Sequence, residues 1–383
     1  MNRFCLHVMT FLKQNRMLRP LRRYIQKHLD LVELRTCSRM LEVQEEECPK
    51  CDYEPAYPYT LGILKEFWHG HRHYVKACHE LKVRYQVLDI TGPDWQEEMQ
   101  QSGCDVYLVL PSVNFSNWKQ MYDERVRVIS EDLGMSIFPS YSALWMWESK
   151  RRTFYWLKAN SISHPRTWVF YDRSQALEFA SRTKLPVVFK SNMGSGASGV
   201  IIFERRSQLC KHISRCFCKG YTNERRGPND REVGSVLFQE YLPNLREWRV
   251  VRIGPSYFAF EKVRSGRFHS GSHLRSYGMP PAGLLDFARA VFDAGGFTSL
   301  SLDVFITEDG RFLVNELHTY FGILNNHEMC MVDGIPGRML HEPPAGWRFE
   351  AGDFCGNYLY NQRVLCVLDS LHQRDQAGAL WPQ

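Results

Sequence analysis

Leu185–Phe203, LPVVFKSNMGSGASGVIIF, carries the strongest structural signal in the chain. Two apolar, β-branched runs, 186–189 and 200–203, flank a loop of Gly, Ser, Ala and Asn, and Lys190 ends the first run. Short apolar runs bounded by glycines predict a β-hairpin with a Gly-rich tip. Glycine lets a backbone approach a ligand closely, and successive N–H groups can bind an anion. We interpret the stretch as a phosphate-covering loop, with an ordinary hairpin turn as the alternative.

Gly194–Gly199 also matches the G-x-G-x-x-G pattern, which two better-known nucleotide-binding classes share. The dinucleotide fingerprint requires a helix after the glycines, whereas the strand-like run 200–203 follows here. Protein kinases place their lysine after the loop and carry H-R-D and D-F-G motifs, which this chain lacks. The sequence therefore excludes both classes.

Length and composition describe a globular protein of two or three domains. The 383 residues are 44% hydrophobic and 23% charged, and the net charge of +6 suits phosphate-bearing ligands without indicating nucleic-acid binding. No uncharged apolar run is long enough to span a membrane, and basic residues interrupt the N-terminal apolar region. We therefore expect a cytoplasmic protein whose twelve cysteines are reduced.

Residues 1–54 are predicted to form a separate extension and linker. Apolar residues are interspersed with arginines and lysines over 9–32, as in a basic amphipathic helix interrupted at Pro20. Such a helix can contact an anionic membrane surface peripherally. Packing on the main body, or an unfolded extension, is the favoured alternative. Cys48 and Cys51 form half of a zinc knuckle, and a pair of loop thiols is the favoured interpretation.

Residues 55–147 are predicted to form an open parallel α/β domain, because short apolar runs alternate with helical segments. The predicted strands are 59–64, 84–90, 106–110 and 137–139, and the helices between them are 74–81, 93–103 and 118–133. The fold class is α/β, passing into α+β further along the chain.

Residues 148–238 contain the Gly-rich hairpin and the elements around it. The predicted elements are helix 150–159, strand 167–170, helix 174–181, helix 207–216 and a polar loop at 221–231. Lys150 stands 40 residues before Lys190, so two lysines can flank one polyphosphate. The alternative for Lys150 is a solvated lysine at a helix start.

Residues 239–383 begin where the strand within 236–243 ends at Gln239 and Glu240. A strand edge that runs into a linker offers backbone groups to a purine, and Glu247 is placed to bind ribose hydroxyls. Period-two alternation puts Glu247 and Arg249 on one face. Lys262 follows, and then a Gly- and Ser-rich segment with Arg264, Arg267, His269 and Arg275. Such a basic segment suits anionic substrates, and a solvated surface loop is the alternative.

A second hairpin is predicted from 301–305, a D-G turn at 309–310, and the strand 311–318. Alternation puts Phe312, Val314, Glu316 and His318 on one face and Asn315 on the other. Asp303 on the partner strand is expected to face Glu316. Adjacent carboxylates repel unless a cation neutralises them, and Mg²⁺ is a natural choice. The alternative is a surface carboxylate pair.

The order of these motifs resembles the ATP-grasp superfamily, which includes D-alanine–D-alanine ligase and glutathione synthetase. The resemblance covers about residues 55–325 and rests on the lysines, the Gly-rich hairpin, Q-E-Y-L, E-W-R, the Asp303 strand and V-N-E-L. It implies a three-domain architecture behind the extension 1–54: a pre-ATP-grasp domain at 55–147, a small subdomain at 148–238 and a large subdomain at 239–383, with ATP held between the last two.

The resemblance also implies roles for individual residues. Lys150 and Lys190 would hold the α- and β-phosphates. The loop would cover the β- and γ-phosphates with Gly194, Ser195, Gly196, Ala197, Ser198 and Gly199. Adenine would meet Gln239, Glu240, Tyr241 and Leu242, and the ribose would meet Glu247. Asp303 and Glu316 would bind Mg²⁺, and Arg249, Lys262 and Arg275 would steady the transferred phosphate or an acyl phosphate.

The chain departs from the family pattern at His318, where members usually carry the Asn of Glu-x-Asn. Asn315 precedes the glutamate and is expected to face away from the site. His318 as a third ligand would bind Mg²⁺ poorly, favour a softer cation such as Mn²⁺, or leave only one metal.

Family chemistry would join a small carboxylate to an amine through an acyl phosphate, with ATP and Mg²⁺ as cofactors. Phosphorylation of a hydroxyl by an ATP-grasp kinase and ATP binding without turnover are the alternatives. A helix is predicted at 354–372 with an apolar stripe that indicates either core or a dimer seam, so a homodimer is among the expected partners. The stripe consists of Leu359, Val364, Leu365, Val367, Leu368 and Leu371.

Overall fold

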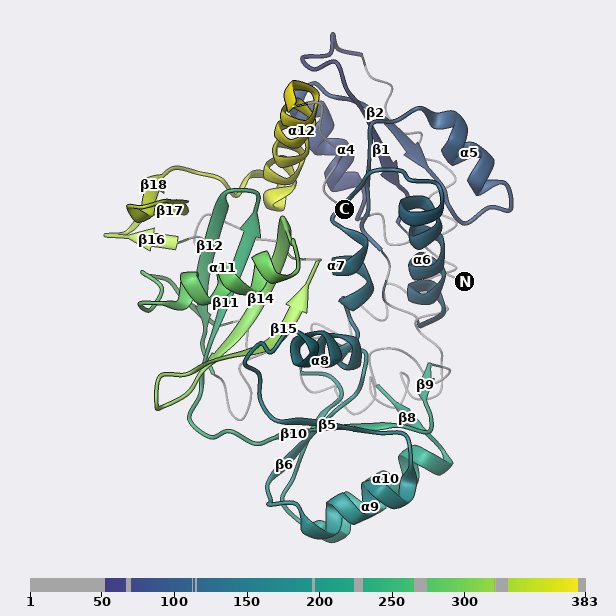
Figure 1. The fold of residues 1–383 in the computed structure, drawn as a ribbon, viewed down its shortest axis with the longest axis vertical. Coiled ribbons are helices and arrows are strands. Elements are labelled where there is room, and N and C mark those ends of the chain that lie inside the picture. Colours follow the sequence, from purple (N-terminus) through teal and green to yellow (C-terminus); the bar gives the residue numbers. More distant parts are fainter. Residues whose placement is uncertain are drawn as a thin grey trace, which may run out of the picture. The chain divides into compact units, whose positions relative to one another are not determined.

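The computed structural model describes residues 52–66, 70–111, 113, 116–194, 197–223, 230–264, 274–319, 321 and 330–377 (Figure 1). The predicted helix within 9–32, the Cys48–Cys51 pair and the basic residues Arg267 and His269 lie outside these ranges. The chain divides into two compact units, one containing 167–241 and the other containing 52–113, 117–166 and 242–377. No helix among the described residues is long and apolar enough to cross a membrane.

The second unit begins with the open parallel sheet that the sequence predicts. Its strands are β1 (Thr60–Leu64), β2 (Arg84–Leu88), β3 (Val106–Leu108) and β4 (Ile137–Phe138), in the order β2-β1-β3-β4. All three pairings are parallel. The crossovers contain α4 (Arg72–Leu81), α5 (Trp95–Ser102) and α6 (Ser116–Arg127), and a π-helical turn (Val128–Asp132) extends α6. The predicted parallel sheet is therefore confirmed.

An eight-stranded antiparallel sheet forms the rest of the second unit. It contains β11 (Arg246–Ile253), β12 (Ser256–Lys262), β14 (Ser299–Ile306), β15 (Phe312–His318), β16 (Cys330–Val332) and β17 (Ile335–Glu342), in the order β15-β14-β11-β12-β17-β16, with β13 (Arg275–Ser276) on β12 and β18 (Gly346–Ala351) on β17. Trp248, Val250 and Leu302 face one hydrophobic cluster, which includes residues of α7 (Tyr141–Met146), α8 (Lys150–Ala159) and α11 (Leu284–Ala294). Alternation therefore directs Glu247, Arg249 and Asp303 to the opposite face.

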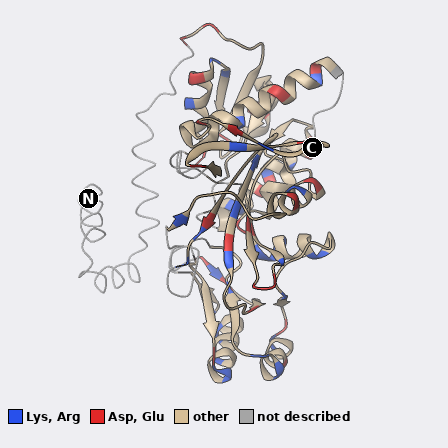
Figure 2. Ribbon diagram, turned by 90° about the vertical axis from the view of Figure 1, so that its left-hand side faces the viewer, with Lys and Arg blue, Asp and Glu red and all other residues tan. Residues whose placement is uncertain are grey.

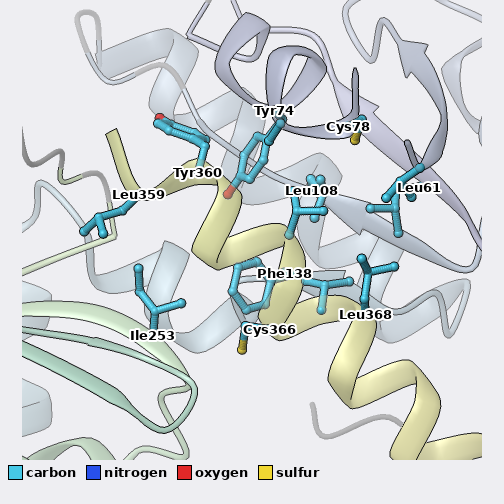
Figure 3. Packing of buried hydrophobic residues seen from close by; sticks show 14 of the residues in the cluster. Leu61, Tyr74, Cys78, Leu108, Phe138, Ile253, Leu359, Tyr360, Cys366 and Leu368 are labelled. Atoms are coloured by element: carbon cyan, nitrogen blue, oxygen red, sulfur yellow. The ribbon is translucent and has the colours of Figure 1, made fainter. Parts of the chain in front are cut away.

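The last helix, α12 (Tyr360–Ala377), completes a core that both sheets of the second unit share (Figure 3). Its apolar stripe packs with Leu61 and Leu108 of the parallel sheet and with Ile253 of the antiparallel sheet. The stripe therefore belongs to the core of the chain, and the dimer-seam interpretation is wrong. The helix also begins later than predicted, because residues 357–359 adopt left-handed backbone angles before it.

The first unit is a four-stranded antiparallel sheet with two helices on one face. Its strands are β5 (Thr167–Phe170), β6 (Val187–Lys190), β7 (Val200–Phe203) and β10 (Val236–Glu240), in the order β5-β10-β6-β7. Phe189 and Phe238 pack against α9 (Arg173–Arg182) and α10 (Arg206–Cys218). The predicted polar loop 221–231 instead begins and ends in paired strands, β8 (Tyr221–Thr222) and β9 (Arg231–Glu232).

Candidate functional site

Six charged or ionisable side chains gather on the face of the antiparallel sheet opposite α11: Glu247, Arg249, Lys262, Asp303, Glu316 and His318. Figure 2 marks the acidic and basic positions along these strands in red and blue. Glu247 pairs in register with Lys262, and Asp303 pairs with Arg249 on one side and Glu316 on the other. Directly opposite residues share a face of a sheet. The predicted facing of Asp303 and Glu316, and the shared face of Glu247 and Arg249, are therefore confirmed.

Asp303 lies at the centre of this charged cluster and is fully buried. The Arg249 guanidinium donates to both of its oxygens, from Nε at 2.7 Å and Nη2 at 2.9 Å, and Lys262 Nζ donates at 3.0 Å. Burial by itself would raise the pKa of Asp303, but Arg249 and Lys262 hold that pKa well below its usual range. The interpretation of Asp303 and Glu316 as a surface pair is therefore wrong.

Lys262 bridges two carboxylates, because its ammonium group donates to Glu247 as well as to Asp303. Burial lowers the pKa of Lys262, but the two carboxylates outweigh it and leave the pKa raised. Glu247 is 2% exposed. Arg275 pairs in register with Lys262, and its guanidinium lies over the ring of Phe260 at 5.3 Å. The structure thus brings the three residues predicted to steady phosphate close to one another.

A β-bulge in β15 changes the predicted faces of that strand. Asp303 pairs with Glu316, but the next residue, Val304, pairs with Val314, so Asn315 is an extra residue in the ladder. Val314 therefore faces the hydrophobic core while Glu316 faces Asp303, and the prediction that they share a face is wrong. The prediction that Asn315 faces away is also wrong, because its Nδ2 lies 3.5 Å from Glu247 Oε1.

Asp303, Glu316 and His318 could hold a metal ion, because each offers one ligand atom and these atoms lie within 4.8 Å of one another. His318 Nε2 is 3.3 Å from an oxygen of each carboxylate. Burial lowers the pKa of His318, but hydrogen bonds with the two carboxylates raise it to about 8. The two carboxylates suit Mg²⁺ or Mn²⁺, and the imidazole favours Mn²⁺.

Basic side chains offset the carboxylates of the cluster without a metal. Lys150 Nζ lies 3.6 Å from Glu316 Oε1, so three basic side chains, Lys150, Arg249 and Lys262, offset the carboxylates of Glu247, Asp303 and Glu316. Side chains thus supply the positive charge that the adjacent carboxylates require. Carboxylate repulsion by itself is therefore no argument for Mg²⁺, contrary to the expectation from the sequence. The Lys150 side chain is 12% exposed, so the solvated-lysine alternative is wrong.

The Gly-rich hairpin of the first unit has the predicted form, with β6 and β7 paired from Val187–Phe203 to Lys190–Val200. Lys190 is buried at the end of β6. Ala197 and Ser198 are described, whereas Ser195 and Gly196 lie outside the described residues. Gly194 and Gly199 have φ of +141° and +78°, and a Cβ on them would lie 2.3 Å from Asn223 Nδ2 and 2.0 Å from Ser191 Oγ. Only glycine fits at both positions.

The segment predicted to meet adenine begins in the last two residues of β10, which is a central strand. β10 pairs with β5 on one side and with β6, as far as Glu240, on the other. The prediction that this strand offers a free edge is therefore wrong, and only residues after Glu240 lie beyond the ladder. Gln239 is buried, and its Nε2 donates to Thr167 Oγ1 at 3.2 Å. Tyr241 and Leu242 are half-buried.

Sequence reasoning missed three polar residues near these groups. Asn315 reaches Glu247 through the bulge, and Asn223 and Glu232 contact the Gly-rich loop from the β8–β9 hairpin. No local pattern marks any of them, because each contact joins residues at least 25 positions apart.

Comparisons with known proteins find a partial sequence similarity to one protein and a similarity of fold to two solved structures. No family model matches. The D-alanine–D-alanine ligase of Tolumonas auensis is 24% identical over 188 residues, which are 46% of this chain and only 56% of that relative. The ATP complex of D-alanine–D-alanine ligase from Bacillus anthracis aligns with a TM-score of 0.54 and 14% identity, covering 84% of this chain and 100% of that one. The ADP complex of N5-carboxyaminoimidazole ribonucleotide synthetase aligns with a TM-score of 0.51 and 12% identity, covering 74% and 82%.

Proposed function

Because the chain has the ATP-grasp fold, we propose that it is an ATP-dependent ligase that joins a carboxylate to an amine. The charged cluster around Asp303 is the observation that carries this proposal. It places basic groups, carboxylates and an imidazole on one face of a sheet. That composition suits a reaction in which negative charge moves between phosphate and carboxylate oxygens.

The proposed reaction has two steps. A carboxylate oxygen of the substrate attacks the γ-phosphorus of ATP, the bond to the bridging oxygen breaks, and ADP leaves. The amine nitrogen then attacks the acyl carbon, phosphate leaves with the C–O bonding electrons, and the nitrogen loses a proton to solvent. Neither step needs a protein nucleophile, so positioning and charge stabilisation supply the catalysis.

Arg249, Lys262 and Arg275 are the proposed groups that face the phosphoryl oxygens. Arg249 is held rigidly, because its two hydrogen bonds to Asp303 fix the guanidinium plane. Lys262 is likewise fixed between two carboxylates. Groups held in place before substrate arrives lose little free energy to reorganisation during the reaction.

Asp303, Glu316 and His318 are the residues that would hold a divalent cation. When bound, such a cation supplies Lewis-acid polarisation of phosphate oxygens. Because basic side chains already offset the carboxylates of the cluster, an added divalent charge is best tolerated when an anionic nucleotide arrives with it. In the first unit, Lys190 and the loop Gly194–Gly199 are the proposed phosphate-binding elements. Gln239, Glu240, Tyr241 and Leu242 are proposed for adenine, and Glu247 for ribose.

The proposal is tested by ADP release in the presence of hydroxylamine, which converts an acyl phosphate into a hydroxamate. The protein is incubated with Mg²⁺- or Mn²⁺-ATP and pools of amino acids and other small carboxylates. A ligase is expected to release ADP and form a hydroxamate only when its carboxylate is present. Release of ADP with a hydroxylamine-stable phosphate ester would instead identify a kinase, and nucleotide binding without ADP would identify a binding module.

Lys190→Ala provides the matched test of the nucleotide site. Nucleotide at about 100 times its dissociation constant stabilises a protein by roughly 2.7 kcal/mol, which shifts the melting temperature by several degrees. We expect wild type to show this shift and Lys190→Ala to lose it. Lys184→Ala, which changes an exposed lysine of the same unit, should keep the shift. No shift in wild type with either metal would remove ATP from the proposal.

A further inference from the structure

We propose that Asn223 and Glu232 are positioning residues that fix the base of the Gly-rich loop for nucleotide binding. This inference rests on the proposed function, because it assigns the loop to phosphate. Both residues belong to the β8–β9 hairpin, and both contact the loop across 25 to 40 positions of sequence. All of the contacts lie within the first unit.

Glu232 holds the start of the loop through its backbone. Its Oε2 accepts from the Asn192 N–H at 2.8 Å, and its Oε1 accepts from the Met193 N–H at 3.0 Å. Hydrogen bonds to a charged acceptor are stronger than those between neutral groups. One carboxylate therefore fixes two successive peptide planes, 191–192 and 192–193, close to the end of β6.

Asn223 joins the two sides of the loop. It is 3% exposed, and its Nδ2 donates to the Met193 carbonyl at 3.3 Å and to Ser198 Oγ at 3.2 Å. Met193 lies before the loop tip and Ser198 lies after it. The amide fits there because Gly194 and Gly199 carry no Cβ, which would approach Asn223 Nδ2 to 2.3 Å and 3.0 Å.

Ser191 closes the same base from inside the loop. Its N–H donates to the Gly199 carbonyl at 2.8 Å, and its hydroxyl donates to the Met193 carbonyl at 2.8 Å. Together with the contacts of Asn223 and Glu232, these bonds fix the direction of the chain on entering and leaving the loop. A loop whose base is held in this way loses less conformational entropy when it binds a ligand.

The pairing of β8 with β9 explains how two distant residues reach the same loop. Tyr221 pairs with Glu232 and Thr222 pairs with Arg231, so Glu232 and Asn223, which follows β8, belong to two paired strands, and both contact the backbone of Met193. Neither residue is assigned to contact the nucleotide. Their proposed role is to act through the loop backbone.

A different role for Glu232 makes the opposite prediction. If the carboxylate occupied the place of a phosphate group, its removal would free two N–H groups and a negative charge would no longer repel the nucleotide. Nucleotide binding would then become tighter. If the carboxylate positions the loop, its removal makes binding weaker.

The experiment measures Mg²⁺-ATP affinity by calorimetry on full-length wild type, Glu232→Ala, Glu232→Gln and Asn223→Asp. We expect affinity to fall about tenfold for Glu232→Ala. We expect the same for Asn223→Asp, whose carboxylate lacks the N–H donor of the amide. We expect about a threefold loss for Glu232→Gln, whose amide keeps one accepting oxygen. Glu178→Gln, which changes an exposed glutamate of the same unit, is the control and should match wild type. Hydrogen exchange of residues 190–199 without nucleotide should be faster than in wild type only in the Glu232 and Asn223 variants.

The outcomes separate the two proposals. If wild type binds nucleotide and the variants show the same affinity and the same exchange, the positioning role is overturned and the proposed function stands. Tighter binding by Glu232→Gln has the same consequence. Failure of wild type to bind nucleotide overturns the proposed function and, with it, this role. If Glu232→Ala does not fold, Glu232→Gln and Asn223→Asp decide the question. A KM for ATP that rises at unchanged kcat is the corresponding kinetic result.

Discussion

Asn315 Nδ2 lies 3.5 Å from Glu247 Oε1, although strict alternation along β15 would place Asn315 on the other face of the sheet. The bulge between the Asp303–Glu316 and Val304–Val314 pairs accounts for the difference. One inserted residue lets Val314 reach the core while Glu316 and His318 stay beside Asp303. The charged cluster around Asp303 therefore includes an amide group that the alternation pattern does not predict.

Replacing Asp303 with Asn should destabilise the protein strongly. Arg249 would lose both of its carboxylate contacts and Lys262 one of its two, and breaking a largely buried ion pair costs roughly 3–5 kcal/mol. Chemical denaturation measures the free energy of unfolding. Asp309→Asn, which removes an exposed carboxylate beside Arg311, should cost much less. Equal stability of the two variants would contradict the central role of Asp303.

Metal binding should depend on nucleotide. Because basic side chains already offset the carboxylates, we expect Mn²⁺ to bind weakly alone and roughly 5- to 150-fold more tightly once ATP is present. Electron paramagnetic resonance measures free Mn²⁺ in both cases, and a protein-free titration with ATP gives the Mn²⁺ that the nucleotide binds by itself. Equal affinity with and without ATP would show that the charge balance does not control the site.

His318→Asn should shift the metal preference toward Mg²⁺, because an amide oxygen is a harder ligand than imidazole nitrogen. We expect Mn²⁺ affinity in the presence of ATP to fall by about tenfold or more. His372→Asn, at an exposed position of α12, is the control. A metal preference that stays the same in His318→Asn would remove the imidazole from the metal site.

The first unit should lose stability in acid through His212. Burial, and to a lesser degree Arg215, lowers the pKa of His212 from 6.5 to about 4. The unfolded chain therefore binds a proton between these values while the folded chain does not, so the free energy of unfolding falls as pH drops below 6.5. The loss reaches about 2 kcal/mol at pH 5.

The matched variant for this effect is His212→Phe, which keeps a ring against Phe189 and Phe203. Unfolding is followed between pH 7.5 and pH 5 for both proteins. Wild type should lose more stability than the variant over this range. Parallel losses would assign the acid sensitivity to other groups.

Leu368→Ala should destabilise the second unit by about 2–5 kcal/mol, because Leu368 is buried in the core that α12 shares with both sheets. Leu274→Ala makes the same chemical change at a side chain that is 52% exposed, and should cost much less. Thermal unfolding compares the two. A small effect at Leu368 would mean that α12 is loosely attached.

The sequence predicted those features that depend on local periodicity. The β6–β7 hairpin, the Asp303–Glu316 pair and helix α8 at Lys150–Ala159 follow from alternation, a D-G turn and helical spacing. The roles of Lys190 in phosphate binding and of Asp303 in metal binding stay predictions, which the proposed experiments test.

Other features depend on contacts that no local pattern encodes. β10 is a central strand because β5 joins it from more than sixty positions earlier in the chain. The bulge at Asn315 has no glycine to signal it, and Asn223 reaches the loop from a segment that reads only as polar. Long-range pairing, rather than propensity, decides each of these outcomes.

The core around α12 also bears on how the chain folds during synthesis. Leu61 and Leu108 of the parallel sheet pack against Val364 and Leu368, so the sheet made first lacks part of its covering until the last described helix has been made. Contacts between such distant segments slow folding and leave apolar surface open meanwhile. We therefore expect the growing chain to need protection by a chaperone, and nascent chains that stop before α12 to aggregate.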